Sequence, residues 1–377
     1  MRAFVFTDPA LARHAGRFVW LALDSEKPQN AAIKQRLKVV ALPTFFVLDP
    51  ADEKVALRWV GGATAPQLSR ILDDGARAVA HGARGVDAVL ARADSLYGEG
   101  EYAGAAERYA AAIAAAPAGW PRRGRAVESL LFAWSQTDRN QECALLAVAE
   151  LPRMRRTPSA GNVAASGLDA ALALPPEHPR RAGLIDTLEA ATRAIVADTA
   201  LVMAADDRSG AYIALLDARD DAKDESGKRR VAAEWAGFLE GQAARARTPE
   251  QRAVFDSHRL SAYLTLGEPA RALPMLEASE RDLPGDYNPP ARLATALKAM
   301  KRWDDALAAS DRAMARAYGP RTLLVLQTRA DIFAGRGDST ATRATLEQAL
   351  QTAESLPAGQ RSESAIASIR KKLDALH

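Results

Sequence analysis

The sequence predicts a two-domain protein, with an α/β domain over residues 1–82 and an all-α domain over residues 83–377. Two observations predict this division. Up to residue 82, short apolar runs of strand length alternate with amphipathic stretches, and proline and glycine separate them. From Val86 onward these runs give way to an alanine-rich helical periodicity that recurs along the chain. At 377 residues and 40.3 kDa, the chain is long enough to bury two hydrophobic cores.

The composition excludes several classes of protein. The net charge of +3 is too small for binding to nucleic acid that is driven by charge alone. A single cysteine, Cys143, excludes an internal disulfide and a zinc site built from several cysteines. We expect no cofactor and no metal, since none of the five histidines has metal-ligand spacing: His14, His81, His178, His258 and His377. Because there is neither a long apolar run nor a signal-peptide pattern, we expect no membrane insertion and assign the chain to the cytoplasm by default.

The first domain has a regular order of predicted elements. Apolar runs bounded by turn residues predict strands, and apolar positions that share one helical face predict helices. The order is a strand at 18–23, a helix at 29–37 with Asn30 as its cap, a strand at 44–48, a strand at 55–60 and a closing helix at 66–80. The turn "DPADEK" between the two later strands predicts a hairpin.

This order, together with the motif "KVVALPTFFVLDP", resembles the second half of a thioredoxin fold. The most specific parts of the resemblance are Leu42-Pro43-Thr44, Asp49-Pro50 and Gly61. It implies a cis peptide bond before Pro43 and a loop, Leu42, Pro43 and Thr44, that binds a substrate peptide. The alternative is a trans proline that only starts a strand.

The chain departs from the thioredoxin pattern in one large respect. The central strand and the Cys-x-x-Cys helix of that family would come before Met1. Without this strand, two buried strands would be left with unpaired edges. We therefore expect the α/β domain to rearrange, to borrow a strand, or to be completed by an upstream segment. If that segment carries a signal, the protein is periplasmic or secreted.

The second domain resembles the tetratricopeptide repeats. The segment "ADSLYGEGEYAGAAERYAAAIAAAP" (93–117) has small residues at Ala93, Ala105 and Ala112, where two helices approach closely. Similar segments lie at 263–284, 297–314 and 330–350, and a weaker one at 130–152 places Cys143 where the first has Ala105. Ala272 and Ala306 are about 34 positions apart, which is the period of this repeat.

The middle of the chain is less regular. Residues 152–181 contain too many helix breakers for one helix, whereas 184–204 and 228–247 have helical patterns. The charged stretch 217–230 indicates a solvated helix end and loop. The region is either one continuous array with imperfect repeats or two arrays with a spacer. Four tryptophans at packing positions are predicted core residues: Trp59, Trp134, Trp235 and Trp303.

The sequence contains no phosphate-binding glycine motif, no nucleophile elbow and no His-Glu-x-x-His. Two hypotheses of function remain. In the first, the chain is an interaction protein whose thioredoxin-like head lacks redox chemistry and whose helical array binds a protein or peptide. In the second, it is most of a thiol–disulfide oxidoreductase whose dithiol lies upstream of Met1. Because a dithiol reaction needs two thiols, an insulin-reduction assay separates them.

Overall fold

The computed structural model describes residues 3–80 and 82–376, so Met1, Arg2, His81 and His377 lie outside the described residues. Its contacts define two compact units. Unit 1 is Met1–Val19 with Leu37–Val231, and unit 2 is Trp20–Arg36 with Ala232–His377. This division differs from the predicted boundary at residue 82, because the N-terminal hairpin lies in one unit with the helices that follow it.

Unit 1 begins with the predicted hairpin. Strands β1 (Thr44–Leu48) and β2 (Val55–Val60) pair antiparallel, with Phe46 opposite Arg58. Helix α2 (Ala65–Val79) follows, and Thr64 and Gln67 form a capping box at its start. The hairpin and closing helix predicted from the sequence are thus confirmed. They enclose a small core together with the 3-10 helix η1 (Pro9–His14): Leu11, Val47, Leu57, Trp59, Ala63, Leu68, Ile71 and Leu72.

The predicted strand at 18–23 is wrong. These residues form neither strand nor helix, and the described residues contain one sheet of two strands. A strand needs a neighbouring edge for its N–H and C=O groups, and no third strand lies there to supply one. Leu21 is 74% exposed, so this apolar run is not buried as its composition predicts.

The helix predicted at 29–37 is shorter than expected. Helix α1 (Ala31–Arg36) follows the 3-10 turn η2 (Pro28–Asn30). The predicted capping role of Asn30 is also wrong, because its side-chain amide donates instead to the carbonyl of Asp24 at 2.8 Å.

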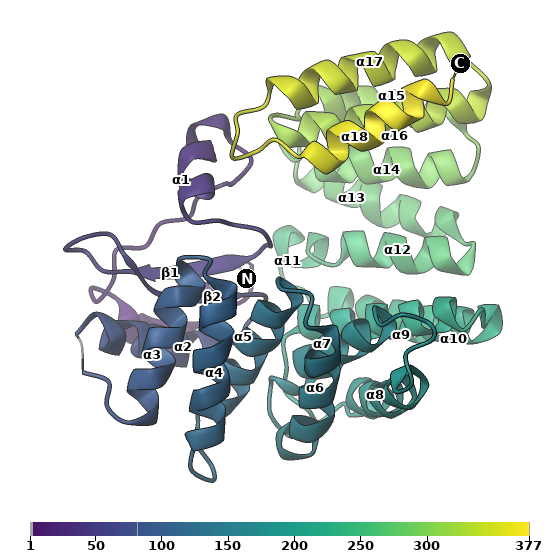
Figure 1. Cartoon of the computed structure of the whole chain (residues 1–377). Helices are drawn as coiled ribbons and strands as arrows, with labels where there is room; N and C mark the ends of the chain where they lie inside the picture. Colours follow the sequence, from purple (N-terminus) through teal and green to yellow (C-terminus); the bar gives the residue numbers. More distant parts are fainter. Residues whose placement is uncertain (1–2, 81, 377) are drawn as a thin grey trace. The chain divides into compact units, whose positions relative to one another are not determined.

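The rest of unit 1 is a series of helices that pack against their neighbours in the chain (Figure 1). They are α3 (Val86–Gly98), α4 (Tyr102–Ala115), α5 (Arg123–Ser135), α6 (Asn140–Met154), α7 (Ala160–Leu172), α8 (Arg181–Ala197) and α9 (Ala205–Asp221). Ala93, Ala105 and Ala112 are fully buried, as the repeat spacing predicts. Helix α9 has no counterpart in the sequence prediction, and α6 continues past Pro152 to Met154.

Helix α10 (Glu225–Ala244) begins in unit 1 and ends in unit 2. Unit 2 then contains a second series of packed helices. They are α11 (Pro249–Ala253), α12 (Asp256–Leu266), η3 (Pro269–Ala272), α13 (Leu273–Asp282), α14 (Asn288–Ala299), α15 (Trp303–Met314), α16 (Pro320–Arg336), α17 (Ser339–Ser355) and α18 (Glu363–Asp374). Gly267 and Gly337 end α12 and α16 with φ of 75° and 84°, a left-handed conformation that glycine adopts without a steric penalty.

The prediction that four tryptophans are core residues is confirmed in part. Trp59 and Trp235 are buried, with 2% of each surface exposed, whereas Trp134 and Trp303 are half-buried.

The repeat spacing gives a prediction for stability. Ala306 is fully buried on α15, which packs against α14 and α16, so Ala306→Leu should destabilise unit 2 by about 1–3 kcal/mol through overpacking. The control is Ala308→Leu on the exposed side of the same helix, which should change stability little. Urea unfolding of both variants measures the difference. Equal midpoints would show that Ala306 does not lie at a close helix contact.

Candidate functional site

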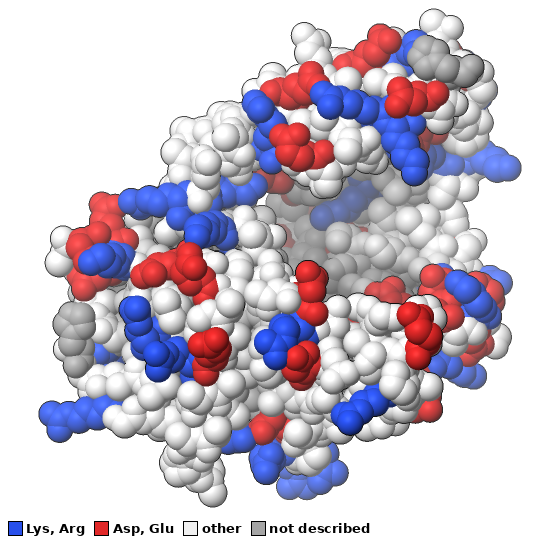
Figure 2. All heavy atoms as spheres, in the orientation of Figure 1, with Lys and Arg blue, Asp and Glu red and all other residues white. Residues whose placement is uncertain are grey.

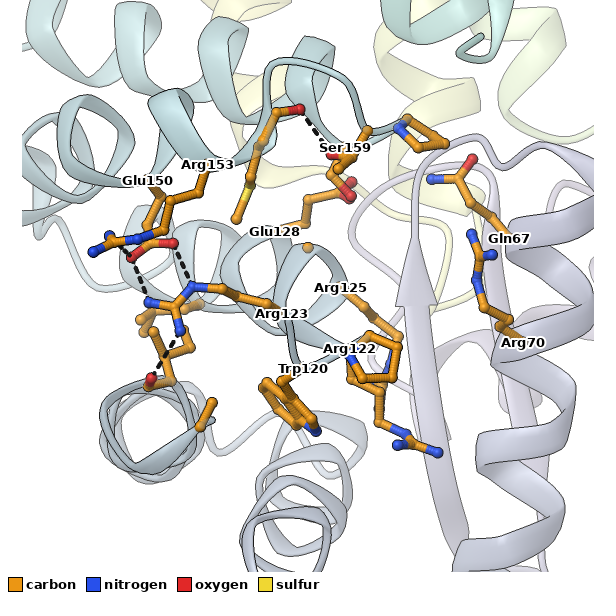
Figure 3. A pocket seen from close by; sticks show the side chains of 18 of the residues that line it. Gln67, Arg70, Trp120, Arg122, Arg123, Arg125, Glu128, Glu150, Arg153 and Ser159 are labelled. Carbon is orange, nitrogen blue, oxygen red and sulfur yellow. Dashed lines mark hydrogen bonds and ion pairs between the residues drawn. The ribbon is translucent and has the colours of Figure 1, made fainter. Parts of the chain in front are cut away.

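Unit 1 contains a cavity of about 1260 Å³, which is large for a small-molecule site. Its walls come from α2, the C-terminal end of α4, the loop 116–122, α5, the end of α6 and the loop that follows it. Figure 3 shows Gln67 and Arg70 of α2 on one side, with Arg123, Glu150 and Arg153 on the other. We call this cavity the arginine pocket.

The lining of the arginine pocket is strongly basic. Seven arginines line it against four carboxyl groups. The arginines are Arg70, Arg77, Arg122, Arg123, Arg125, Arg153 and Arg156, and the carboxyl groups belong to Asp73, Asp74, Glu128 and Glu150. This excess is local. Over the face drawn in Figure 2, acidic and basic side chains are interspersed, and the net charge of the whole chain is only +3.

Asp74 neutralises three of these arginines. Its carboxylate accepts from Arg77 at 3.1 Å and from Arg122 at 2.7 Å, and Arg125 lies 3.4 Å away. Arg122 also pairs with Asp87 at 3.0 Å, and Arg125 with Asp94 at 2.8 Å. Asp74 lies on α2 and its main partners lie in or just before α5, so this network fixes the two walls of the pocket relative to one another.

A second network of ion pairs lies on the other side of the arginine pocket. Arg123 donates to both oxygens of Glu150, at 2.6 and 2.7 Å, in the bidentate geometry that suits a guanidinium. Arg153 donates to the same carboxylate at 3.2 Å (Figure 3). The Glu150 side chain is only 5% exposed, and hydrogen bonding from Arg123 is the largest cause that lowers its pKa.

Two arginines of the arginine pocket differ from the other five because no carboxylate among the described residues pairs with them. Arg70 on α2 and Arg156 after α6 are exposed, and neither has an ion pair or hydrogen bond with any described residue. The charges of the other arginines are compensated by the carboxylates described above. Arg70 and Arg156 are therefore the guanidinium groups that remain available to an anionic ligand.

Glu128 of α5 also lines the arginine pocket, and its side chain is partly buried. Asn162 of α7 donates to Glu128 Oε2 at 2.8 Å, while Oε1 is buried without a hydrogen-bond partner among the described residues. Burial raises the pKa of Glu128 to about 7, although Ser159 and Asn162 offset part of this rise. Asp207 of α9 is also buried, and desolvation followed by repulsion from Glu128 raises its pKa well above the usual value. Below neutral pH, the protonated Glu128 can donate a hydrogen bond.

The pocket also offers apolar surface. Ile113, Met154 and Trp120 line it, and Trp120 is held by a hydrogen bond from its Nε1 to Asp87 at 2.9 Å. The combination of free guanidinium groups with aromatic and aliphatic surface suits a ligand that is anionic and partly apolar.

The predicted substrate loop does not line this pocket. Leu42 is 66% exposed, and neither its N–H nor its C=O is engaged by another described residue. The Leu42–Pro43 peptide bond is cis, as the sequence context predicts. The carbonyl of Pro43 accepts from Gly61 at 2.9 Å, and the Thr44 hydroxyl donates to Ala41 at 2.6 Å.

Cys143 occupies the packed position that the repeat spacing predicts. It is 2% exposed, and burial raises the pKa of its thiol to about 12, so the reactive thiolate is disfavoured. Among residues 3–80 and 82–376, no group of acidic, histidine or cysteine side chains is arranged to hold a metal ion. None of the described helices is long and apolar enough to cross a membrane.

The sequence reasoning missed the arginine pocket. All six residues of the segment "WPRRGR" (120–125) line it, and the clustered arginines of this segment are a signal in the sequence that indicates an anionic ligand. The signal is incomplete, because Arg70 and Asp74 come from the N-terminal region and only the fold brings them to α5.

Comparison with known proteins adds one likeness. No protein-family model matches the chain, and no curated protein matches it in sequence. Among solved structures, it is similar to a tetratricopeptide repeat protein from Parabacteroides merdae ATCC 43184, with a TM-score of 0.44 and 12% identity. That alignment covers 77% of this chain and 98% of the other.

Proposed function

We propose that this chain is a protein-interaction module, and that the arginine pocket of unit 1 binds an acidic, partly apolar segment of a partner protein. The observation that supports this proposal is the pair Arg70 and Arg156, which have no carboxylate partner in a pocket where five other arginines are neutralised. A planar guanidinium binds carboxylates in bidentate fashion, so acidic side chains are the natural partner. The large volume and apolar walls favour a peptide segment over a small anion.

Binding of a labelled peptide of repeating Glu-Glu-Leu, measured by fluorescence anisotropy, tests the proposal. We expect Arg70→Glu/Arg156→Glu to weaken binding by about tenfold to a hundredfold, because two attractive charges become repulsive. We also expect binding to weaken as salt is added.

Two controls make this test specific. Arg92→Glu/Arg108→Glu reverses two exposed arginines on α3 and α4 that do not line the pocket, and it should leave binding nearly unchanged. A matched peptide of repeating Gln-Gln-Leu should bind poorly. Equal affinities of the two double variants for the acidic peptide would contradict the assignment of the pocket.

The tetratricopeptide-like character of the helical domain and the thioredoxin-like character of residues 1–82 belong to the same proposal. Support for the helical domain comes from its small-residue spacing and its paired helices. Support for the head comes from the order α1, β1, β2, α2 and from the cis bond at Leu42–Pro43.

The exposed Leu42, whose backbone groups are free, favours a second candidate site on the head. The outer edge of β1 pairs with no other described strand, so an extended peptide could add to it beside Leu42, Pro43 and Thr44. In this role the head binds a peptide without redox chemistry. The oxidoreductase alternative would require a dithiol from beyond Met1, and insulin reduction remains the assay that separates the two.

A further inference from the structure

Unit 2 contains a contact between residues that are 294 to 335 positions apart in the sequence. Residues 24–31, which precede and begin α1, lie against the N-terminal end of α16 and the loop between α17 and α18. We call residues 24–31 the docked segment. The residues that receive it are Tyr318, Gly319, Arg321, Gly359 and Gln360, and we call them the docking site.

Side chains of the docking site bind the carboxylates of the docked segment. Arg321 Nη2 donates to Asp24 at 3.1 Å, and its Nε donates to Glu26. The Tyr318 hydroxyl donates to the same oxygen of Asp24. Burial, followed by the hydrogen bond to Asp24, raises the pKa of Tyr318 to about 12, so this hydroxyl keeps its proton at neutral pH.

The docking site also binds the main chain of the docked segment. The side-chain amide of Gln360 donates to the carbonyls of Ser25 at 3.0 Å and Lys27 at 2.9 Å. Gln360 is only 5% exposed, so this amide is held in place for the contact. In the docking site, an arginine and a tyrosine bind an acidic pair, and a buried amide binds main-chain carbonyls. This combination is typical of peptide recognition.

Two glycines allow the docked segment to approach closely. A Cβ added to Gly319 would lie 2.3 Å from the carbonyl oxygen of Glu26, and one added to Gly359 would lie 2.2 Å from that of Ala31. The docked segment itself contributes little to the core of unit 2, since Ala31 is the only fully buried residue among its eight positions. Its attachment is therefore mostly polar, as for a bound peptide.

We propose that the docking site is a peptide-binding site for a turn-forming segment with an Asp-x-Glu pattern, and that the chain's own residues 24–31 occupy it. A segment of the same chemistry from another protein binds there when the docked segment is released. The tether gives the docked segment a local concentration on the order of millimolar, so an added peptide competes poorly with it in the unaltered protein.

The test uses the full chain and a labelled peptide with the sequence of residues 22–32. Asp24→Lys/Glu26→Lys places two cations against Arg321 and should release the docked segment. Hydrogen exchange of residues 20–36 should then become at least about tenfold faster. The labelled peptide should bind this variant at least about tenfold more tightly than it binds the unaltered protein.

Three further variants keep the test decisive. Gly359→Ala should release the docked segment by steric clash while every charge is retained. Arg321→Glu, added to the released variant, should abolish peptide binding, whereas Arg329→Glu on the same helix, whose partner is Asp311, should not. A peptide with Asn and Gln in place of Asp24 and Glu26 should bind weakly. Unchanged hydrogen exchange in both release variants, or release without peptide binding, would overturn the proposal.

Discussion

Arg123→Ala should destabilise unit 1 by about 3 kcal/mol, because it leaves the buried carboxylate of Glu150 without its bidentate partner. The Glu150 side chain is 5% exposed, so water cannot replace the lost guanidinium. The substitution also removes the hydrogen bond from Arg123 to the carbonyl of Ile113 at 3.2 Å. Urea unfolding followed by circular dichroism, with hydrogen exchange of residues 123–154, measures this loss.

Arg153→Ala is the matched control, since it removes the other arginine from the same carboxylate. Arg153 is 62% exposed and lies 3.2 Å from Glu150, so its loss should change stability by less than about 1 kcal/mol. Equal losses of stability in Arg123→Ala and Arg153→Ala would mean that burial of an ion pair with Glu150 does not decide how much the pair stabilises the fold.

The loss of stability caused by Arg123→Ala should also depend on pH. The folded-state pKa of Glu150 is lowered, chiefly by hydrogen bonding from Arg123, so the pair stabilises the fold above the unfolded pKa of about 4.3. This stabilisation is lost as the pH falls through the folded-state pKa. The difference between the variant and the unaltered protein should therefore shrink toward acidic pH.

Glu128→Gln should abolish a pH dependence of acidic-peptide binding that the unaltered protein shows between about pH 6 and pH 8. In the unaltered protein, Glu128 gains a proton as the pH falls through about 7, which removes a negative charge from the arginine pocket. Binding of the Glu-Glu-Leu peptide should therefore be tighter at pH 6 than at pH 8. Glutamine has no such titration, so the affinity of the variant should be nearly constant.

The carboxyl group of Glu128 should also make stability depend on pH, in the opposite direction from that of Glu150. Because the folded-state pKa of Glu128 is raised from 4.5 to about 7, the folded state binds more protons than the unfolded state between these values. Stability therefore falls as the pH rises through this window. Glu128→Gln should be more stable than the unaltered protein at pH 8, by about 1–3 kcal/mol, and close to it at pH 4.

Glu142→Gln on α6 is the control for both measurements. Glu142 does not line the pocket, and contacts with its own backbone N–H and Arg139 outweigh partial burial and lower its pKa. It should leave both pH profiles between 6 and 8 unchanged. If Glu128→Gln and Glu142→Gln give the same binding profile as the unaltered protein, Glu128 does not titrate in the pocket.

The sequence by itself determined the local elements that need only neighbouring residues. The strands at 44–48 and 55–60 follow from apolar runs around one turn, and the closing helix follows from an apolar face. The burial of Ala105, Ala306 and Cys143 follows from the repeat spacing, because only small side chains fit where helices approach closely.

The tertiary structure decided what depends on distant partners. Residues 18–23 have strand composition but lack a neighbouring edge, so they form no strand. The arginine pocket joins Arg70 and Asp74 of α2 to arginines of α5, and no local pattern predicts that these residues meet. Likewise, Asp24 and Glu26 lie in a charged loop of ordinary composition, and only the fold places Arg321 and Gln360 against them. Propensity and periodicity act over a few residues, whereas these ion pairs depend on how the whole chain packs.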